Sequence, residues 1–411
     1  MSMERLSNAY ERLTINPENG ECMYLLGFTV MLFRDTMITT MFPFSENVSH
    51  ICLLILLTLI CGKILLFDNY SLKMLIAVIM MLACGVLVAL SSGYIYPFQW
   101  LLLIIGAKDV SFEKIVRLYL IVNISIVSLA FCASMLGIIE NLVYIENKTG
   151  ALRNSFGCIY TTDFAAHIFY MILAVFYIKR NVIHWWYYIC TVLAAGLVYY
   201  FCRAKLDTVC ILLTAFVFGI YNLYKYQYDK EKCRYRFRWQ KKYKIFIKRY
   251  IKKSVIIVPV LAAFTYMLSY MYVPDNEFMA AVNDISTGRV SLGNIGIKKY
   301  GMTFFGQDVP MTGFGGTTKP PKKYFIIDCS YIHVYLKYGL VMTFMLFIIY
   351  FVICKKRADV ELMLMVIIMA VSCTVDHHLL DIAYNFVPLA LFAAVESKAA
   401  GKRVLIEKIT C

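Results

Sequence analysis

The sequence predicts an all-α polytopic membrane protein, with a single transmembrane domain of about twelve helices over residues 1–411. Hydrophobic residues make up 61% of the chain and the mean hydropathy is +0.67, which is more apolar surface than a soluble core can bury. Apolar runs of roughly 17 to 25 residues recur along the chain, and each can cross the hydrocarbon of a bilayer as a helix. The positive charge is concentrated in one segment, because residues 225–253 contain thirteen Lys or Arg and two acids.

The transmembrane helices are expected near residues 22–42, 48–66, 72–90, 93–107, 115–138, 157–178, 183–202, 206–224, 254–274, 330–353, 360–377 and 379–396. If the N-terminus starts inside, each inner connection receives cations, and the largest group of them lies in the basic loop 225–253. The positive-inside rule therefore predicts that this loop and both termini are cytoplasmic. The N-terminal segment lacks a basic region followed by a short apolar stretch and a cleavage site, so no cleaved signal peptide is expected.

Three connections on the opposite side of the membrane are candidates for a functional site. They are residues 139–156, the long loop 275–329 between the ninth and tenth spans, and the DHHLLD turn at 376–381. The long loop is rich in glycine but keeps apolar residues at helical spacing, so we expect an ordered segment with short helices at the membrane surface. A loop of this length is usually functional or disordered, and we expect this one to cover a site.

Charged residues near the outer ends of spans six to eight form the first candidate group. Arg153 precedes span six, and Asp163 and His167 follow within that span at i+4 spacing. Arg203 and Asp207 lie at the junction of spans seven and eight, where the positive-inside tendency disfavours cations. The functional interpretation is an anion site for lipid phosphate, because a guanidinium matches phosphate oxygens with two parallel donors. The structural alternatives are an Arg203–Asp207 pair at i+4 and a packing role for Asp163 and His167.

A second candidate group lies in the later outer segments. Arg289 is in the long loop, where a lone arginine is usually solvated. Asp328 precedes span ten, and a carboxylate at the water edge of a membrane cavity can act as a general base. His333, His377 and Asn385 are further polar candidates, although a polar group such as Asn385 within a span is more often a helix-packing residue.

One charged pair lies within the first span. Arg34 and Asp35 are neighbours in an apolar run, where an unpaired charge is costly. They are expected to pair with each other, to face a cavity, or to lie nearer the end of the helix. We expect these two residues to form a helix-packing ion pair.

Several function classes lack support in the sequence. No phosphate-binding GxxxxGK[ST] loop, dinucleotide fingerprint, HExxH or GxSxG motif occurs, so no cofactor is expected. The histidines do not form a second cluster that would supply the ligands of a catalytic metal. The basic loop is read as an orientation signal, and no nucleic acid partner is predicted.

The order of short motifs resembles the O-antigen and capsule repeat-unit polymerase family (Wzy), in its Gram-positive exopolysaccharide form. The motifs are RNSFGCIYTTDFAAH, CRAKLD, GRVSLG, FFGQ, IIDCSYIHVYLKYGL and DHHLLDIAYNF, in that order from residue 153 to residue 386. The resemblance implies a C-type membrane glycosyltransferase fold related to the O-antigen ligases. It also implies that Arg153, Arg203 and Arg289 hold the pyrophosphates of two undecaprenyl-linked substrates. Asp328 stands where the ligases commonly have a histidine proposed as the base, which leaves the base open.

The implied activity is polymerisation of undecaprenyl-pyrophosphate-linked oligosaccharide units at the outer face of a bacterial cytoplasmic membrane. The implied reaction is one inverting displacement, in which the arginines stabilise the departing lipid pyrophosphate in place of a metal. Besides the substrate and membrane lipid, a chain-length regulator and a flippase of the same pathway are possible partners. The alternatives are a ligase that transfers the glycan to another acceptor, and a polysaccharide flippase or transporter.

Overall fold

The computed structural model describes residues 17–146, 149–181, 183–232, 256–356 and 359–395. Most of the basic loop 225–253 lies outside these residues. The described elements are α2 (Pro17–Ile38), α3 (Glu46–Leu66), α4 (Leu72–Ser92), α5 (Tyr96–Gly106), α6 (Phe112–Met135), β1 (Val143–Ile145), β2 (Leu152–Asn154), α7 (Thr161–Ile178), α8 (Trp185–Cys202), α9 (Lys205–Lys232), α11 (Ile257–Tyr270), α12 (Glu277–Ile285), α13 (Arg289–Tyr300), α14 (Ser330–Lys356), α15 (Val360–Ser372) and the 3-10 helix η3 (Val387–Leu391).

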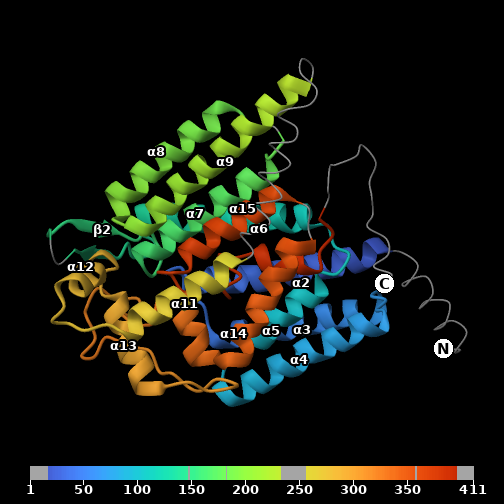
Figure 1. Cartoon of the computed structure of the whole chain (residues 1–411), viewed down its shortest axis with the longest axis horizontal. Helices are drawn as coiled ribbons and strands as arrows, with labels where there is room; N and C mark the ends of the chain where they lie inside the picture. Colours follow the sequence, from blue (N-terminus) through green and yellow to red (C-terminus); the bar gives the residue numbers. More distant parts are fainter. Residues whose placement is uncertain (1–16, 147–148, 182, 233–255, 357–358, 396–411) are drawn as a thin grey trace, which may run out of the picture.

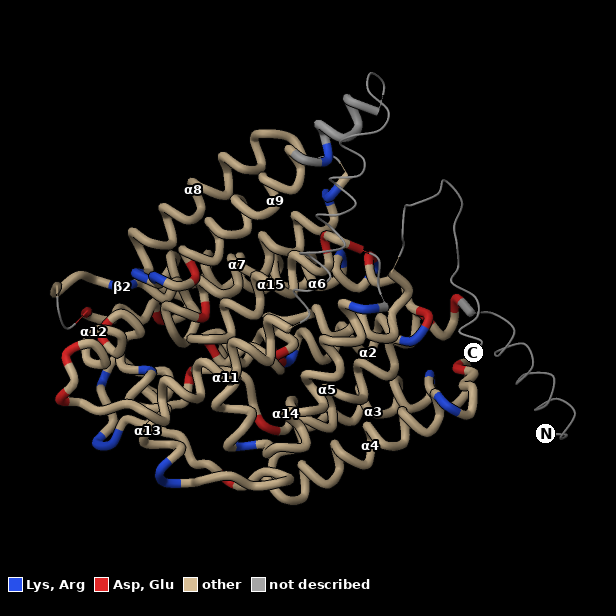
Figure 2. The backbone as a smooth tube through the Cα atoms, viewed as in Figure 1, with Lys and Arg blue, Asp and Glu red and all other residues tan. Residues whose placement is uncertain are grey.

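The chain is a helical, multi-pass membrane protein. Within the described part, α3, α4, α6, α7, α8, α9 and α14 are long and apolar enough to cross a membrane. The outer helices expose large aliphatic side chains, as Leu54 on α3, Leu90 on α4 and Leu197 on α8 show, and Figure 2 shows these helices free of charge over most of their length. Such a surface matches lipid and would be unfavourable in water. Helix α2 has a similar length but carries Arg34 and Asp35 near its end.

The centre of the bundle is built from short helices that the outer helices enclose. Helix α5 has eleven residues, of which Pro97 and every residue from Gln99 to Gly106 are buried. At 1.5 Å per residue it is about 16 Å long, so it cannot cross a bilayer alone. Helix α15 has thirteen residues and is also almost entirely buried. Both segments were predicted as spans, and both are helical but shorter than the prediction.

The prediction of a twelfth α-helical span at 379–396 is wrong over the described residues 379–395. This segment consists of turns and the 3-10 helix η3, although most of it is buried. Neighbouring side chains satisfy its backbone: Tyr119 donates to the Ala383 carbonyl at 3.1 Å, and the Ile382 amide donates to the Tyr96 hydroxyl at 3.1 Å. Irregular backbone inside a membrane protein is tolerated where the protein supplies such partners, so an apolar run here was not sufficient evidence for a helix.

The charged connections lie at two ends of the bundle. Ion pairs join connections at one end, including Glu113 with Arg180 at 3.3 Å and Lys225 with Glu361 at 3.1 Å. Lys63 donates to the Lys108 carbonyl at this same end, at 2.6 Å. We call this the basic end, and it contains the cations that were predicted to share one side.

The β1–β2 hairpin, α12 and α13 lie at the other end of the bundle (Figure 1), which we call the hairpin end. The strands pair in antiparallel register, with Tyr144 opposite Arg153. The loop 275–329 contains α12 and α13, the short helices that its apolar spacing predicted. Two of the three connections singled out in the sequence are therefore close together.

The FFGQ motif of this loop docks at an interruption in α14. Gly339 has φ 78° and ψ −179°, which breaks the helix, and the Leu340 and Val341 amides donate instead to the Thr303 and Phe304 carbonyls at 3.0 Å each. The Gln307 amide in turn donates to the Lys337 carbonyl at 3.1 Å. The loop thus replaces backbone hydrogen bonds that the kink removes, and the motif has a structural role.

Candidate functional site at the hairpin end

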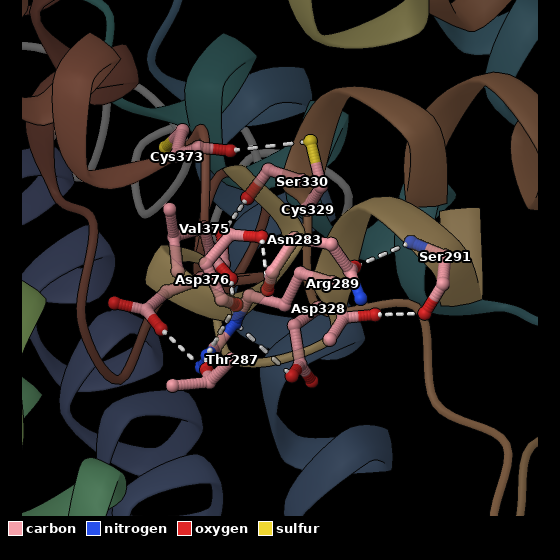
Figure 3. Close-up of polar contacts among 12 residues, drawn as sticks. Asn283, Thr287, Arg289, Ser291, Asp328, Cys329, Ser330, Cys373, Val375 and Asp376 are labelled. Carbon is pink, nitrogen blue, oxygen red and sulfur yellow. Dashed lines mark hydrogen bonds and ion pairs between the residues drawn. The ribbon is translucent and has the colours of Figure 1, made fainter. Parts of the chain in front are cut away.

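Arg289 is the centre of a charged cluster that joins three separate segments. Its Nε lies 3.3 Å from Asp328 Oδ2, and its Nη2 lies 3.5 Å from Asp376 Oδ1. Figure 3 shows the guanidinium with these two carboxylates beside it. Asp328 precedes α14 and Asp376 follows α15, so Arg289 at the start of α13 ties the long loop to both helices. The sequence had suggested a solvated loop arginine, but its side chain is only 17% exposed.

The backbone before α13 determines the direction of Arg289. Thr287 has φ 55° and Gly288 has φ 87°, so two successive residues are in the left-handed region, which is unusual for threonine. The Asn283 side chain accepts a hydrogen bond from the Ser291 amide at 2.9 Å, which satisfies one of the free donors of the first helical turn. This tight turn brings the Arg289 side chain to the Val375 carbonyl, to which Nε donates at 2.8 Å.

The guanidinium of Arg289 still has donor capacity. Nη1 donates to the Thr287 hydroxyl and, at 3.4 Å, to the Ser286 carbonyl. Among the described residues, the one partner of Nη2 is Asp376, in an ion pair at 3.5 Å, which exceeds normal hydrogen-bond length. One edge of Arg289 can therefore donate to an incoming anion without loss of its other contacts.

The pKa values at the cluster reflect burial and charge together. Burial by itself would lower the pKa of Arg289, but the nearby Asp328 and Asp376 reverse the effect and raise it. Burial raises the pKa of Asp376 to about 6, although Arg289 opposes that rise. Asp376 thus titrates close to neutrality, which is the range that suits a proton acceptor.

Arg153 lies next to this cluster on β2. Its Nε donates to the Cys202 carbonyl at 3.1 Å and its Nη2 to the Thr161 hydroxyl at 2.8 Å. Burial lowers the pKa of Arg153; Glu146 opposes this effect and the positive charge of Arg289 adds to it. Two guanidinium groups that repel each other in a partly buried region are stabilised by an anion between them.

Arg203 is the third predicted arginine, and it lies at the turn between α8 and α9. Its backbone is left-handed, with φ 52° and ψ 29° at the end of α8. Its guanidinium carbon is 5.4 Å from the centre of the Tyr199 ring, and its buried Nε has no hydrogen-bond partner. Within the described part of the chain, no ion pair joins Arg203 to Asp207, so the structural alternative of an i+4 pair is not observed.

The predicted acids Asp207 and Asp163 are both buried near the cluster. Asp207 is in the first turn of α9, and its Oδ1 is buried without a hydrogen-bond partner. Asp163 is in the first turn of α7 and is also buried. His167, one turn later, bonds the Thr39 hydroxyl at 2.9 Å rather than Asp163. A carboxylate oxygen that is buried without a donor is costly in its ionised form, so Asp207 is unfavourably placed as a charged group.

The predicted histidines form a row of rings beside Asp376. His333 on α14 and His377 have ring centres 5.9 Å apart, and His377 and His378 are 5.0 Å apart. His377 is exposed, whereas His378 is buried and its ring centre lies 3.8 Å from that of Tyr384, with the two rings tilted. The described residues contain no group of three His, Cys, Asp or Glu that could hold a metal ion.

The contacts of Asn385 match a packing role. Its Nδ2 donates to the Tyr350 hydroxyl at 3.0 Å and to the Leu379 carbonyl at 2.8 Å, and its Oδ1 accepts from the Val387 amide at 3.2 Å. Its amide group is engaged within the protein, and the residue is fully buried. These contacts favour the structural alternative over direct substrate binding.

The sequence analysis identified a histidine of the DHHLLD turn as a candidate but neither of its two acids, Asp376 and Asp381. Asp376 contacts Arg289, as described above, and Asp381 and Asp35 both lie within hydrogen-bond distance of the same tyrosine hydroxyl. The Tyr96 hydroxyl donates to Asp35 at 2.9 Å and is 3.5 Å from Asp381. Asp35 also pairs with Arg34 at 2.7 Å, which agrees with the predicted packing pair. The sequence feature that could have indicated these acids was the carboxylate at each end of the short DHHLLD motif.

Comparisons with known proteins add no further assignment. No family model matches the chain, and no curated protein or solved structure matches it.

Proposed function

We propose that the chain is a membrane glycosyltransferase that polymerises undecaprenyl-pyrophosphate-linked oligosaccharide units into capsular polysaccharide or exopolysaccharide. The observation that supports this most is the group of three arginines at the hairpin end. The positive charge of Arg289 lowers the pKa of Arg153, and Arg153 donates to the carbonyl of Cys202, the residue before Arg203. Donors on Arg289 and Arg203 are free of hydrogen bonds within the described structure. Grouped guanidinium donors in a partly buried region match the oxygens of a pyrophosphate.

The proposed chemistry is one displacement at an anomeric carbon. A hydroxyl oxygen of the incoming lipid-linked unit forms the new bond to that carbon, and the bond to the lipid pyrophosphate of the growing chain breaks. The arginines stabilise the charge that develops on the departing pyrophosphate. The hydroxyl proton passes to a carboxylate, for which Asp328 and Asp376 are the two candidates. Asp328 is the more accessible, with a side chain 20% exposed against 5% for Asp376.

The proposed topology places the hairpin end outside the cell. The cations Lys63, Lys108, Arg180 and Lys225, which lie in helices or in the connections between them, occupy the basic end. The positive-inside rule assigns that end to the cytoplasm. Both termini then lie on the cytoplasmic side of a bacterial cytoplasmic membrane. Eleven of the twelve predicted spans overlap described helices, and seven of these helices are long and apolar enough to cross a membrane. A C-type glycosyltransferase-like bundle is the finer fold proposal.

The test is reconstitution of the purified protein in liposomes with lipid-linked single repeat units from a strain that lacks the gene. Products longer than one unit, with release of undecaprenyl pyrophosphate, are expected. In the strain itself, single lipid-linked units should accumulate at the outer face. Accumulation at the inner face would identify a flippase instead, and transfer of complete glycan to another acceptor without chain growth would identify a ligase.

A further inference from the structure

Four aromatic side chains from separate segments form one cluster at the hairpin end. Tyr144 of β1 stacks on Tyr160 with ring centres 6.2 Å apart, and it meets Phe314 edge-on at 5.4 Å. Phe314 in turn lies 5.7 Å from Tyr324. We call Tyr144, Tyr160, Phe314 and Tyr324 the aromatic platform.

Hydrogen bonds hold the platform in place. The Tyr144 hydroxyl donates to the Ile159 carbonyl at 2.8 Å, which fixes the hairpin against the start of α7. The Gly315 amide donates to the Tyr160 hydroxyl at 3.4 Å. Gly313 permits this close approach, because a Cβ atom there would lie 2.5 Å from the same hydroxyl oxygen. The platform is therefore a built surface.

The platform continues into the charged cluster. Tyr324 is close enough to Asp328, Arg289 and Arg153 for each of their charges to influence its hydroxyl. Burial, followed by the charge of Asp328, raises the pKa of Tyr324 to about 12, so this hydroxyl remains a neutral donor. Its side chain is still open to a ligand, since the residue is 42% exposed.

A membrane-interface belt is the simpler explanation of single exposed aromatics. Tyr270 on α11 is such a residue, 60% exposed and stacked only on its helical neighbour Tyr266. The platform differs from it in two respects: its rings pack on one another across three segments, and the charges of Arg289 and Arg153 act on the hydroxyl of Tyr324. An apolar ring surface beside donors for phosphate matches a ligand that has an apolar face directly attached to an anion.

We propose that the aromatic platform is a carbohydrate subsite that binds the pyranose ring or rings attached to the lipid pyrophosphate. The C–H face of a pyranose packs on an aromatic ring, while the Tyr324 hydroxyl and the acid oxygens of Asp328 bond its hydroxyls. This subsite deepens the proposed function and rests on it, because the pyrophosphate on the arginines fixes which sugars reach Tyr324. The platform holds the first sugar so that its anomeric carbon lies beside Asp328 and Arg289.

The experiment compares two probes on the full-length protein in nanodiscs. One is undecaprenyl pyrophosphate carrying a single repeat unit, and the other is undecaprenyl pyrophosphate without sugar. Tyr324→Ala should weaken binding of the sugar-bearing lipid about ten-fold, equivalent to about 1.4 kcal/mol, and leave binding of the bare lipid unchanged. Tyr324→Trp should restore sugar binding, and the belt variant Tyr270→Ala should bind both lipids as the unaltered protein does.

The outcomes separate the platform from the polymerase proposal. An equal loss for both lipids in Tyr324→Ala would overturn the sugar subsite, as would no loss for either. Arg289→Ala should weaken both lipids alike, because it removes a phosphate contact. If Arg289→Ala leaves both unchanged, the pyrophosphate site and hence the proposed function fail, whatever the result for Tyr324.

Discussion

Replacement of Arg289 by lysine tests the charged cluster most directly. Lysine keeps the positive charge between Asp328 and Asp376, so neither acid loses its cation, and the fold should persist. It cannot reproduce the forked donors that contact the Val375 carbonyl and the Thr287 hydroxyl while Nη2 remains available. The expected defect is therefore in substrate binding and transfer, while protein level is retained.

The size of the defect follows from the number of donors lost. One charge-assisted hydrogen bond to a phosphate contributes roughly 1.5–3 kcal/mol. Its loss corresponds to an affinity for lipid pyrophosphate that is roughly 10- to 150-fold weaker. If the interaction strengthens as the pyrophosphate departs, the rate of chain growth falls by at least the same factor.

The assay is polymer formation in liposomes, followed by gel separation of products by length, together with binding of undecaprenyl pyrophosphate. Arg117→Lys is the matched control, since Arg117 pairs with Glu113 at the basic end and its side chain is 54% exposed. Normal polymer yield and normal lipid binding in Arg289→Lys would refute the assignment. A loss of equal size in Arg117→Lys would show that the assay reports general damage.

Three further predictions concern other parts of the site and its support. A proton acceptor must be ionised, and the pKa of Asp376 is about 6, so chain growth should fall as the pH drops below about 6. Asp376→Asn should remove that pH dependence from the residual activity, and an unchanged pH profile in this variant would exclude Asp376 as the acceptor. Arg203→Ala should weaken lipid pyrophosphate binding about ten-fold and leave the thermal midpoint in detergent unchanged, since no ion pair with Asp207 is lost; a lowered midpoint would indicate a structural role. Gly157→Ala should reduce the free energy of unfolding by roughly 1–3 kcal/mol and so lower the thermal midpoint, because Gly157 has φ 80° and a Cβ would collide with the Ala130 carbonyl. An unchanged midpoint would contradict the reasoning.

Much of the fold was accessible from hydropathy because lipid imposes a simple rule. A long apolar run that must satisfy its own backbone becomes a helix, and α3, α4 and α8 follow that rule. The rule fails where protein replaces lipid. In the buried segment 379–395, the Ile382 amide donates to the Tyr96 hydroxyl and the Ala383 carbonyl accepts from Tyr119. Both tyrosines lie far away in sequence, so the apolar composition of the segment could not reveal its conformation.

The candidate site was only partly accessible for a related reason. Arg289 and Arg153 could be identified individually, since cations in outer connections oppose the usual charge bias. Their partners depend on tertiary contacts: Asp376 follows Arg289 by 87 positions, and Cys202 follows Arg153 by 49. The two left-handed residues before Arg289 decide where its side chain points, and nothing in the local composition except Gly288 indicated such a turn.

The contacts that tie each end of the bundle bear on the proposal that the chain is an enzyme and not a transporter. Alternating access requires that the two ends of a transporter open in turn. Here both ends are tied across segments, by Arg289 with Asp328 and Asp376 at the hairpin end and by Glu113 with Arg180 at the basic end. Opening the hairpin end would separate Arg289 from both acids. A reaction between two lipid-linked substrates at one face requires no such opening, so these contacts are consistent with the proposed glycosyltransferase.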